Sequence, residues 1–148
     1  MNVLITGGNG YIARSLFNSF SDKFDVTCVT RKDFDLSDSA QTLEWFKDKK
    51  FDVVLHTAII GGSRLSPDDT SIIDKNLMMY YNLVSNKNCF GKLISFGSGA
   101  EIFSPDTPYG LSKKIISESI KNTENFYNIR IFGVFDENEL ETRFIKSN

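Results

Sequence analysis

Short apolar runs alternate along this chain with longer stretches in which apolar residues recur every three or four positions. The runs are rich in β-branched and aromatic residues and predict strands at 3–5, 25–30, 51–57, 91–97 and 126–135. The stretches with helical spacing predict helices at 11–20, 39–50, 69–86, 108–122 and 137–146. A further, very short strand fits at 33–38, just before the second helix.

This alternation predicts one α/β domain over residues 1–148, built on a doubly wound parallel sheet of about six strands. Helices cover both faces of such a Rossmann-type sheet, and its default strand order is 3-2-1-4-5-6. No linker, repeat or low-complexity tract divides the sequence. Polar residues that follow the strands are therefore expected to gather at the carboxyl edge of a single sheet.

Composition and charge narrow the range of functions. The 148 residues carry a net charge of −2, which argues against a broad surface for nucleic acid or for an anionic membrane. The sequence has one histidine, two cysteines and no CxxC pair, so no metal site is expected, and Cys28 and Cys89 are expected to be reduced thiols. The first strand leaves no room for a signal peptide and no apolar run reaches membrane-spanning length, so a cytoplasmic protein is expected.

The first strand runs into the turn Thr6-Gly7-Gly8-Asn9-Gly10, and the first helix follows at once. Glycines in such a turn let the backbone approach a pyrophosphate, while the helix N-terminus presents N–H groups and its positive dipole end. Ala13 takes the place of the third small residue that lets helix and strand pack closely. The turn predicts a dinucleotide site, and an ordinary tight turn between a strand and a helix is the alternative.

Arg31 stands just past the second predicted strand, and no carboxylate occupies position 30 or 31. In this fold an acidic residue there binds the ribose 2′-hydroxyl of NAD, whereas an arginine can pair with the 2′-phosphate of NADP. Arg31 therefore favours NADP as the cofactor, with NAD as the alternative. A solvated surface pair of Arg31 and Lys32 is the other interpretation of these charges.

Tyr109 and Lys113 stand four residues apart near the start of a predicted helix, for which Thr107 is the expected N-cap and Pro108 the first residue. The spacing puts both side chains on one helix face, where an ammonium and the helix N-terminus favour the phenolate form of a tyrosine. The pair suits proton transfer beside a hydride carrier, although a surface pair has the same spacing. Ser98, after the preceding strand, is placed either to hold a substrate oxygen or to make a plain turn.

Three polar residues within apolar stretches have open roles. His56 lies in a strongly apolar strand and is expected to be a hydrogen-bonded core residue rather than a catalytic group. Asn76 and Asn82 lie on the 69–86 helix, where asparagine is a weak helix former and needs a partner. We expect Asn76 either to hold a backbone carbonyl or a water near the site, or to belong to a polar helix face.

Taken together, these segments resemble the extended short-chain dehydrogenase/reductases, the NAD(P)-dependent epimerase/dehydratase group that acts on nucleotide sugars. The matching pieces keep the family's order and spacing along nearly the whole chain. They are Thr6 to Ile12 for the TGGxGFIG motif, Asp35-Leu36-Ser37-Asp38 for DLxD, His56-Thr57-Ala58 for HxA, the helix residue Asn76, Ser98 with Tyr109-x-x-x-Lys113, and Arg130 to Phe135 for the strand beside the substrate. Arg31 and Ile60-Gly61-Gly62 look closest to GDP-fucose synthase-like and dTDP-dehydrorhamnose reductase-like members, which use NADPH.

The resemblance implies specific roles for these residues. Tyr109 would be the general acid/base, Lys113 would hold the ribose and favour the Tyr109 phenolate, and Ser98 would bind the substrate oxygen. The nicotinamide would exchange a hydride with a sugar carbon. The cofactor would contact Gly7, Asn9, Gly10, Tyr11, Ile12, Arg31, Asp35, Leu36, Thr57, Ala58, Asn76, Tyr109 and Lys113. The 69–86 and 108–122 helices form the dimer bundle in this family, and the apolar run from Met78 to Tyr81 favours a homodimer here as well.

The sequence also departs from the family pattern. Ala13 replaces the last glycine of the turn, and Gly99 and Phe103 occupy places where relatives often carry a second hydroxyl residue and a tyrosine. The C-terminal domain that closes over a nucleotide sugar is not part of the 148 residues. Two functions therefore stay open, an NADP-dependent enzyme acting on a sugar or nucleotide sugar, and a non-catalytic dinucleotide-binding module that senses cofactor or assists a partner enzyme.

Overall fold

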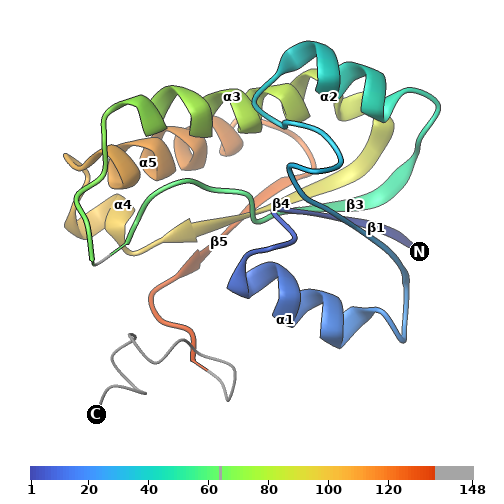
Figure 1. Cartoon of the computed structure of the whole chain (residues 1–148), viewed down its shortest axis with the longest axis horizontal. Helices are drawn as coiled ribbons and strands as arrows, with labels where there is room; N and C mark the ends of the chain where they lie inside the picture. The colour runs from blue at the N-terminus through green and yellow to red at the C-terminus, as the bar shows by residue number, and fades with distance from the viewer. Residues whose placement is uncertain (64, 136–148) are drawn as a thin grey trace.

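The computed structural model of the chain describes residues 1–63 and 65–135. Strands and helices alternate along it as expected (Figure 1). The strands are β1 (Asn2–Thr6), β2 (Asp25–Val29), β3 (Phe51–His56), β4 (Phe90–Ser98) and β5 (Phe126–Ile131). The helices are α1 (Tyr11–Phe20), α2 (Ser39–Phe46), α3 (Ser71–Ser85), the 3₁₀ turn η1 (Lys87–Cys89), α4 (Ala100–Phe103) and α5 (Pro108–Ile120). The helix predicted over 137–146 lies outside the described residues.

The strands form one parallel sheet in the order β2-β1-β3-β4-β5, which confirms the predicted doubly wound architecture. The chain moves from β1 to β2 on one side and then crosses back to β3 on the other. Thr6 at the end of β1 is in register with Val29 of β2 and with His56 of β3. Loops leaving this edge diverge in opposite directions, and such a switch point is where open α/β sheets hold their ligands.

The sheet has one strand fewer than predicted, because residues 33–38 form a capping loop instead of a strand. The backbone N–H of Asp35 donates to the Gln41 side chain (3.1 Å) rather than to a neighbouring strand. The Asp38 carboxylate is the N-cap of α2 and accepts hydrogen bonds from the N–H groups of Ala40 and Gln41 at 2.9 and 3.0 Å. The default order therefore holds without its outermost strand.

Further boundaries differ from the sequence prediction, and β5 ends at Ile131 rather than at position 135. The α2 helix ends at Phe46 rather than near position 50, because Asp48 adopts the left-handed backbone with φ of 60°. The loop predicted over 98–107 contains the short helix α4, which begins where the Ser98 hydroxyl accepts a hydrogen bond from Ala100 N (3.2 Å). The N-cap of α4 is Gly99, so this hydrogen bond closes a local turn just before the helix.

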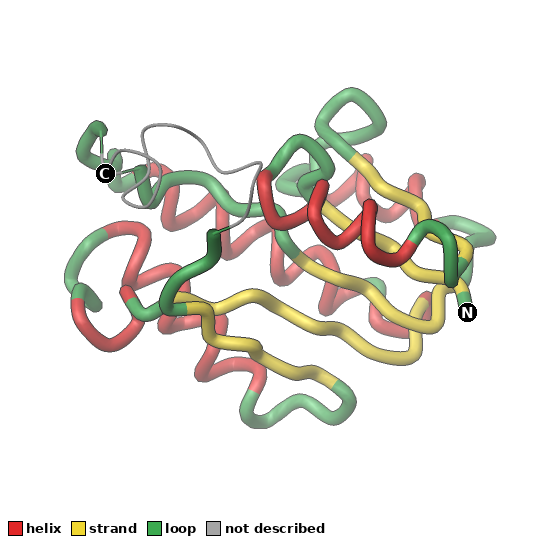
Figure 2. Tube along the Cα trace, turned by 90° about the horizontal axis from the view of Figure 1, so that it is seen from below, coloured by secondary structure: helices red, strands yellow, loops and turns green. Residues whose placement is uncertain are grey.

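Helices lie on both faces of the sheet, as predicted. The α2, α3 and α5 helices cover one face and α1 covers the other (Figure 1). Figure 2, seen from below, shows α1 in front of the strands and the remaining helices behind them. The crossover from β2 to β3 passes over β1, which places α2 on the face shared with α3 and α5.

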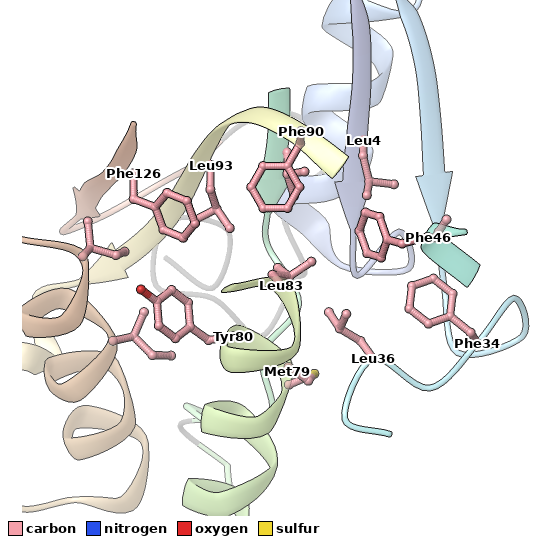
Figure 3. Packing of buried hydrophobic residues seen from close by; sticks show 14 residues of the cluster. Leu4, Phe34, Leu36, Phe46, Met79, Tyr80, Leu83, Phe90, Leu93 and Phe126 are labelled. Atoms are coloured by element: carbon pink, nitrogen blue, oxygen red, sulfur yellow. The ribbon is translucent and has the colours of Figure 1, made fainter. Parts of the chain in front are cut away.

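The larger hydrophobic core lies between the sheet and the three-helix face (Figure 3). Phe46 of α2, Leu83 of α3 and Leu93 of β4 are fully buried there. Leu4 points into this core, while its neighbours Val3 and Ile5 pack on the α1 side. Because both faces of β1 are covered, its residues form a continuous apolar run rather than an alternating one. Packing of the core on both faces thus holds the strands in place, and with them the polar residues at their carboxyl ends.

Candidate functional site

The glycine turn between β1 and α1 packs tightly against the ends of its two neighbouring strands. Gly7 has a φ of +71°, and a Cβ there would lie 2.7 Å from Ala58 Cα. Gly8 donates its N–H to Val29 O (2.8 Å), and a Cβ there would lie 2.7 Å from Cys28 Sγ. Both positions therefore require glycine for backbone conformation or for space.

The N-terminus of α1 opens directly from this turn. Gly10 is the N-cap in extended conformation, and it has no side chain to accept hydrogen bonds from the first helical turn. Its own N–H donates to Gly7 O (2.8 Å), which holds the turn closed. Ala13 is completely buried against the sheet, as expected for the small residue at this place. A helix N-terminus of this kind presents N–H groups and positive dipole to an anion.

A cleft of about 360 Å³ lies over the switch point of the sheet. It is lined by eight residues that the sequence assigned to the cofactor: Gly7, Asn9, Gly10, Arg31, Asp35, Leu36, Thr57 and Ala58. It is also lined by residues that the sequence did not assign to the cofactor: Thr6, Val29, Thr30, Phe34, Ile59, Ile60 and Met79. Most of the second group are apolar, and nothing in a sequence pattern separates an apolar cleft wall from core.

The carboxylates after β2 are engaged by their own loop. Asp33 accepts hydrogen bonds from Thr30 N (2.7 Å) and Thr30 Oγ1 (3.0 Å), which lower its pKa. Asp35 accepts from Ser37 Oγ (2.7 Å) and Ser37 N (2.9 Å), which likewise lower its pKa, with a smaller effect of the Arg31 charge. Arg31 lines the cleft, so a positive charge stands where the second strand ends.

His56 and the two residues after it connect the ends of β1 and β3. Thr6 Oγ1 lies 3.0 Å from His56 Nδ1 and accepts a hydrogen bond from Ala58 N (3.3 Å), while Thr57 Oγ1 donates to Thr6 O (2.6 Å). Burial, with a further effect of the Lys113 charge, lowers the pKa of His56 to about 3, so the ring is neutral. The prediction of a buried, hydrogen-bonded histidine is confirmed.

Asn76 is completely buried and fixes the loop that borders the cleft. Its Oδ1 accepts from Ile60 N (2.8 Å), and its Nδ2 donates to Ile60 O (2.9 Å) and to Ser112 Oγ (3.2 Å). The expectation that Asn76 holds a backbone carbonyl is therefore confirmed. Asn76 does not line the cleft described above, and its contact with a cofactor stays a prediction.

Tyr109 and Lys113 lie on α5, whose start is as predicted: Thr107 is the N-cap and Pro108 the first residue. Lys113 Nζ lies 5.8 Å from the centroid of the Tyr109 ring and donates a hydrogen bond to Phe96 O of β4. Burial lowers the pKa of Lys113 to about 8, and the Glu101 charge opposes this effect. The two side chains thus share one face, with a buried ammonium beside the phenol ring.

The loop after β3 packs onto the same ring. A Cβ at Gly62 would lie 2.9 Å from Tyr109 Cε2, and Gly62 has a φ of +77°. The N–H of Gly62 donates to the Asp68 carboxylate at 3.0 and 3.1 Å to its two oxygens. This loop therefore joins the cleft wall at Ile60 to the side of the Tyr109 ring.

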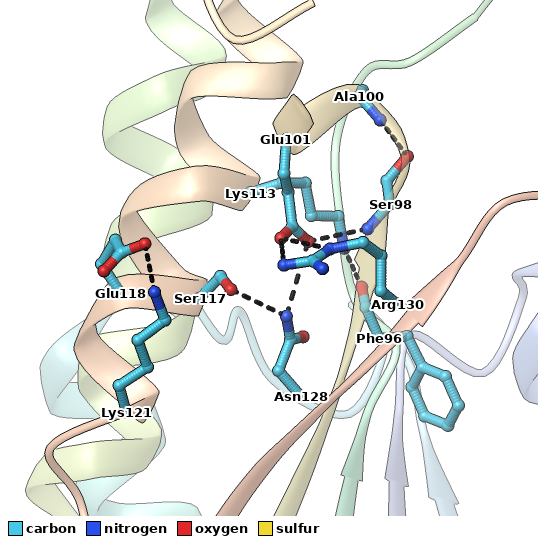
Figure 4. Close-up of polar contacts among 10 residues, drawn as sticks. All are labelled: Phe96, Ser98, Ala100, Glu101, Lys113, Ser117, Glu118, Lys121, Asn128 and Arg130. Atoms are coloured by element: carbon cyan, nitrogen blue, oxygen red, sulfur yellow. Dashed lines mark hydrogen bonds and ion pairs between the residues drawn. The ribbon is translucent and has the colours of Figure 1, made fainter. Parts of the chain in front are cut away.

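Ser98 is the last residue of β4, two positions after the carbonyl that Lys113 binds (Figure 4). Its backbone N–H donates to Glu101 Oε1 (2.8 Å). The structure therefore brings Ser98, Tyr109 and Lys113 to one end of the sheet. It places Tyr11 and Ile12 in the first turn of α1, both half-buried and outside the residues that line the cleft.

Glu101 is a buried acidic residue that the sequence prediction missed. Its side chain is only 2% exposed, and Arg130 Nη2 lies 3.0 Å from its Oε2 (Figure 4). In the sequence it is one of two acids, with Asp106, in the predicted loop 98–107, a pattern typical of solvent exposure. Its neighbours Ile102 and Phe103 are exposed, so the local sequence carries no signal for the burial of Glu101.

Two other features bear on the class of site. Within residues 1–63 and 65–135, His, Cys, Asp and Glu side chains do not gather in groups of three that could hold a metal ion. The helices of the described part are too short or too polar to cross a membrane.

The structure is similar to those of several sugar-nucleotide enzymes. A dTDP-4-dehydrorhamnose reductase from Clostridium acetobutylicum is 18% identical with a TM-score of 0.82, over 99% of this chain and 57% of that chain. A GDP-mannoheptose C4 reductase from Campylobacter jejuni, solved with NADP bound, is 20% identical with a TM-score of 0.75, over 87% of this chain and 50% of that chain. The chain thus spans about half the length of these structures, and at such identity the likeness shows the Rossmann-type fold.

Family membership is shown by a match to the amino-acid sequence. No curated protein matches the chain in sequence. The family model described as NAD dependent epimerase/dehydratase matches residues 3–138, which include the glycine turn, both ends of the cleft and the α5 pair. Since that match covers most of the 148 residues, the chain belongs to the NAD dependent epimerase/dehydratase family.

Proposed function

We propose that this chain binds NADP and carries the hydride-transfer site of a reductase, epimerase or dehydratase that acts on a sugar or nucleotide sugar. The observation that supports this most is the position of the Tyr109–Lys113 pair. It lies at the carboxyl edge of the same sheet whose switch point holds the glycine-lined cleft. The similar structures bear the names of reductases of GDP- and dTDP-linked sugars, which fits a substrate of this class.

The residues of the cleft fit a dinucleotide. Glycine at positions 7 and 8 lets the turn pack against Ala58 and Cys28, and the N-terminus of α1 opens from the same turn. In this proposal Gly7, Asn9, Gly10, Tyr11 and Ile12 hold the pyrophosphate. Further along the cleft, the adenine and ribose side would contact Asp35, Leu36, Thr57 and Ala58, and Asn76 would keep the bordering loop in place. The nicotinamide ring, when bound, supplies or accepts the hydride.

Arg31 selects NADP over NAD in this proposal. Its side chain lines the cleft, and the nearest acid, Asp33, uses its carboxylate to hold Thr30. A guanidinium at this place can pair with a 2′-phosphate, whereas a ribose 2′-hydroxyl would lack its usual carboxylate partner. We expect Arg31→Ala to weaken NADPH binding about tenfold to a hundredfold and NADH binding little. Lys23→Ala, an exposed lysine before β2, is the control.

Three side chains carry the chemistry in this proposal. Tyr109 gives a proton to, or takes one from, the substrate oxygen, and the buried Lys113 ammonium favours its phenolate form. Lys113 also contacts the cofactor ribose. Ser98 holds the substrate oxygen from the end of β4, where its hydroxyl also accepts from Ala100 N. The Ser98 N–H donates to Glu101, so two hydrogen bonds hold the backbone at this position.

The test combines cofactor binding with turnover. Wild-type protein is titrated with NADPH and with NADH, and then assayed for cofactor oxidation with a panel of 4-keto nucleotide sugars. We expect tight binding of NADPH, turnover by wild type, and loss of turnover without loss of binding in Tyr109→Phe. Tyr127→Phe changes an exposed tyrosine of β5 and serves as the control. Failure to bind either dinucleotide would refute the proposal.

One observation favours a second function. The chain spans about half the length of the similar structures, and the cleft it forms is the one lined by the glycine turn. The second candidate is a dinucleotide-binding module that senses cofactor or assists a partner enzyme. NADPH binding together with inert wild-type protein across the whole panel would support it over the first.

We also propose that the protein forms a homodimer through α3 and α5. These helices pack side by side on one face of the sheet, and Tyr80 Oη donates to Ser119 Oγ between them (3.2 Å). Met78 and Tyr81 remain 42% and 43% exposed, so apolar surface is left on the outer side of α3. A monomeric mass in sedimentation equilibrium would contradict this.

A further inference from the structure

We propose that Glu101 is a positioning residue that couples the Ser98 turn to the Tyr109–Lys113 pair. The inference rests on the proposed function, since it assigns a task within the same site. Glu101 stands outside the residues that the sequence motifs singled out, yet its carboxylate is the most buried acidic group in the described part of the chain. A buried carboxylate needs several partners, and the identity of these partners points to its task.

The carboxylate joins the end of β4 to β5. Glu101 Oε1 accepts from the backbone N–H of Ser98 (2.8 Å). Glu101 Oε2 accepts from Arg130 Nε (3.1 Å) and lies 3.0 Å from Arg130 Nη2. Both oxygens are thus in use, one on the backbone of Ser98 and the other on a guanidinium of the neighbouring strand (Figure 4). Removing the carboxylate would release the N–H that sets the direction of the Ser98 side chain.

Neighbouring residues are arranged around this carboxylate. Asn128 Nδ2 donates to Ser117 Oγ of α5 (3.0 Å) and lies 3.5 Å from Glu101 Oε1. A Cβ at Gly97 would collide with Glu101 Oε1 and with the Asn128 amide, so glycine at that position leaves room for the network. The carboxylate therefore belongs to a built polar cluster that spans β4, α4, α5 and β5.

The same charge acts on Lys113. Three titratable groups act on or lie beside the ammonium: Glu101 from α4, His56 from β3 and Tyr109 from its own helix. Arg130 from β5 pairs with Glu101. His56 is neutral, and burial lowers the pKa of Lys113 while the Glu101 charge raises it. Loss of that charge would make Lys113 release its proton at lower pH.

The experiment separates charge from hydrogen bonding with two variants. Glu101→Gln keeps an oxygen that can accept from Ser98 N–H but removes the charge, and Glu101→Ala removes both. Glu118→Gln removes an exposed carboxylate of α5 that pairs with Lys121, and serves as the matched control. Each full-length protein is labelled with carbon-13 lysine, and the Lys113 resonance, assigned with Lys113→Arg, is titrated by NMR. The alkaline limb of the turnover profile is recorded alongside.

We expect the Lys113 titration and the alkaline limb to move to lower pH in Glu101→Gln and to stay in place in Glu118→Gln. We expect kcat in Glu101→Ala to fall below that of Glu101→Gln, because the Ser98 turn also loses its anchor. An unmoved Lys113 titration in folded Glu101→Gln overturns the inference. The NMR titration needs no turnover. A wild-type protein without activity would therefore refute the proposed enzyme, while the Lys113 titration would still test the coupling to Glu101.

Discussion

The replacement Lys113→Met is expected to stabilise the protein while it removes a residue of the proposed site. Lys113 is 7% exposed, and its ammonium lies between the Tyr109 ring and the Phe96 carbonyl. Methionine has a similar length and no charge, so it can occupy the same space. A buried charge that is kept for chemistry costs folding free energy, and the variant reveals that cost.

The size of the effect follows from the titration of Lys113. The ordinary pKa of a lysine is 10.5, and burial, opposed by the Glu101 charge, lowers that of Lys113 to about 8. At about 1.4 kcal/mol for each tenfold loss of proton affinity, the charge costs about 3 kcal/mol at neutral pH. Methionine forgoes the hydrogen bond to Phe96 O, which offsets about 1 kcal/mol. We therefore expect the free energy of unfolding to rise by about 2 kcal/mol.

The difference in free energy of unfolding between wild type and Lys113→Met should depend on pH. The folded protein loses the Lys113 proton near pH 8, whereas the unfolded chain keeps it up to about pH 10.5. Raising the pH through this window therefore stabilises wild type, and the advantage of Lys113→Met shrinks across it. Urea denaturation at several pH values measures the difference, with Lys114→Met, an exposed neighbour, as control. The expected cost of the Lys113 charge is refuted if Lys113→Met is no more stable than wild type at neutral pH. It is also refuted if the difference in free energy of unfolding between the two proteins does not change with pH.

Three further variants test the scaffold of the site by urea denaturation. Gly7→Ala should lose about 2–3 kcal/mol of unfolding free energy, because its φ is +71° and its Cβ would lie 2.7 Å from Ala58 Cα; Gly133→Ala, with no atom within 4 Å of a Cβ, should change little. Asn76→Ala should cost about 2–3 kcal/mol, because both backbone groups of Ile60 lose their partner, and an effect under about 0.5 kcal/mol would contradict this. Asp38→Ala should cost about 1 kcal/mol through loss of the α2 cap, and unchanged stability would contradict the capping role.

Much of the candidate site was accessible from local sequence patterns. The glycine turn, the N-cap Thr107 and the four-residue spacing of Tyr109 and Lys113 each act within one turn of backbone. The structure places them as expected, with Gly7 in the left-handed region and Lys113 beside the Tyr109 ring. Such features are predictable because their geometry depends on covalent neighbours and on helical periodicity alone.

The sequence misjudged segments whose partners lie elsewhere. The sequence predicts a very short strand at residues 33–38. Instead, the Gln41 side chain accepts from Asp35 N, Asp38 caps α2, and Asn82 of α3 donates to Leu36 O (2.8 Å). Glu101 has the sequence pattern of a surface acid, but it bonds Arg130, which lies on β5, 29 residues later in the chain. Asn82 stands 46 residues from Leu36 and Arg130 stands 29 from Glu101, so a short sequence window contains neither of these hydrogen bonds.

The sequence by itself therefore determined the order of strands and helices, the parallel sheet and the residues that could bind a dinucleotide, because hydrophobic periodicity and turn chemistry are local properties. Only the tertiary structure decided which polar groups are buried and what they contact. Burial sets the charge state of His56 and Lys113, and the pairing of β4 with β5 brings Arg130 to Glu101. Desolvation and charge pairing depend on distances through space, which the fold alone supplies.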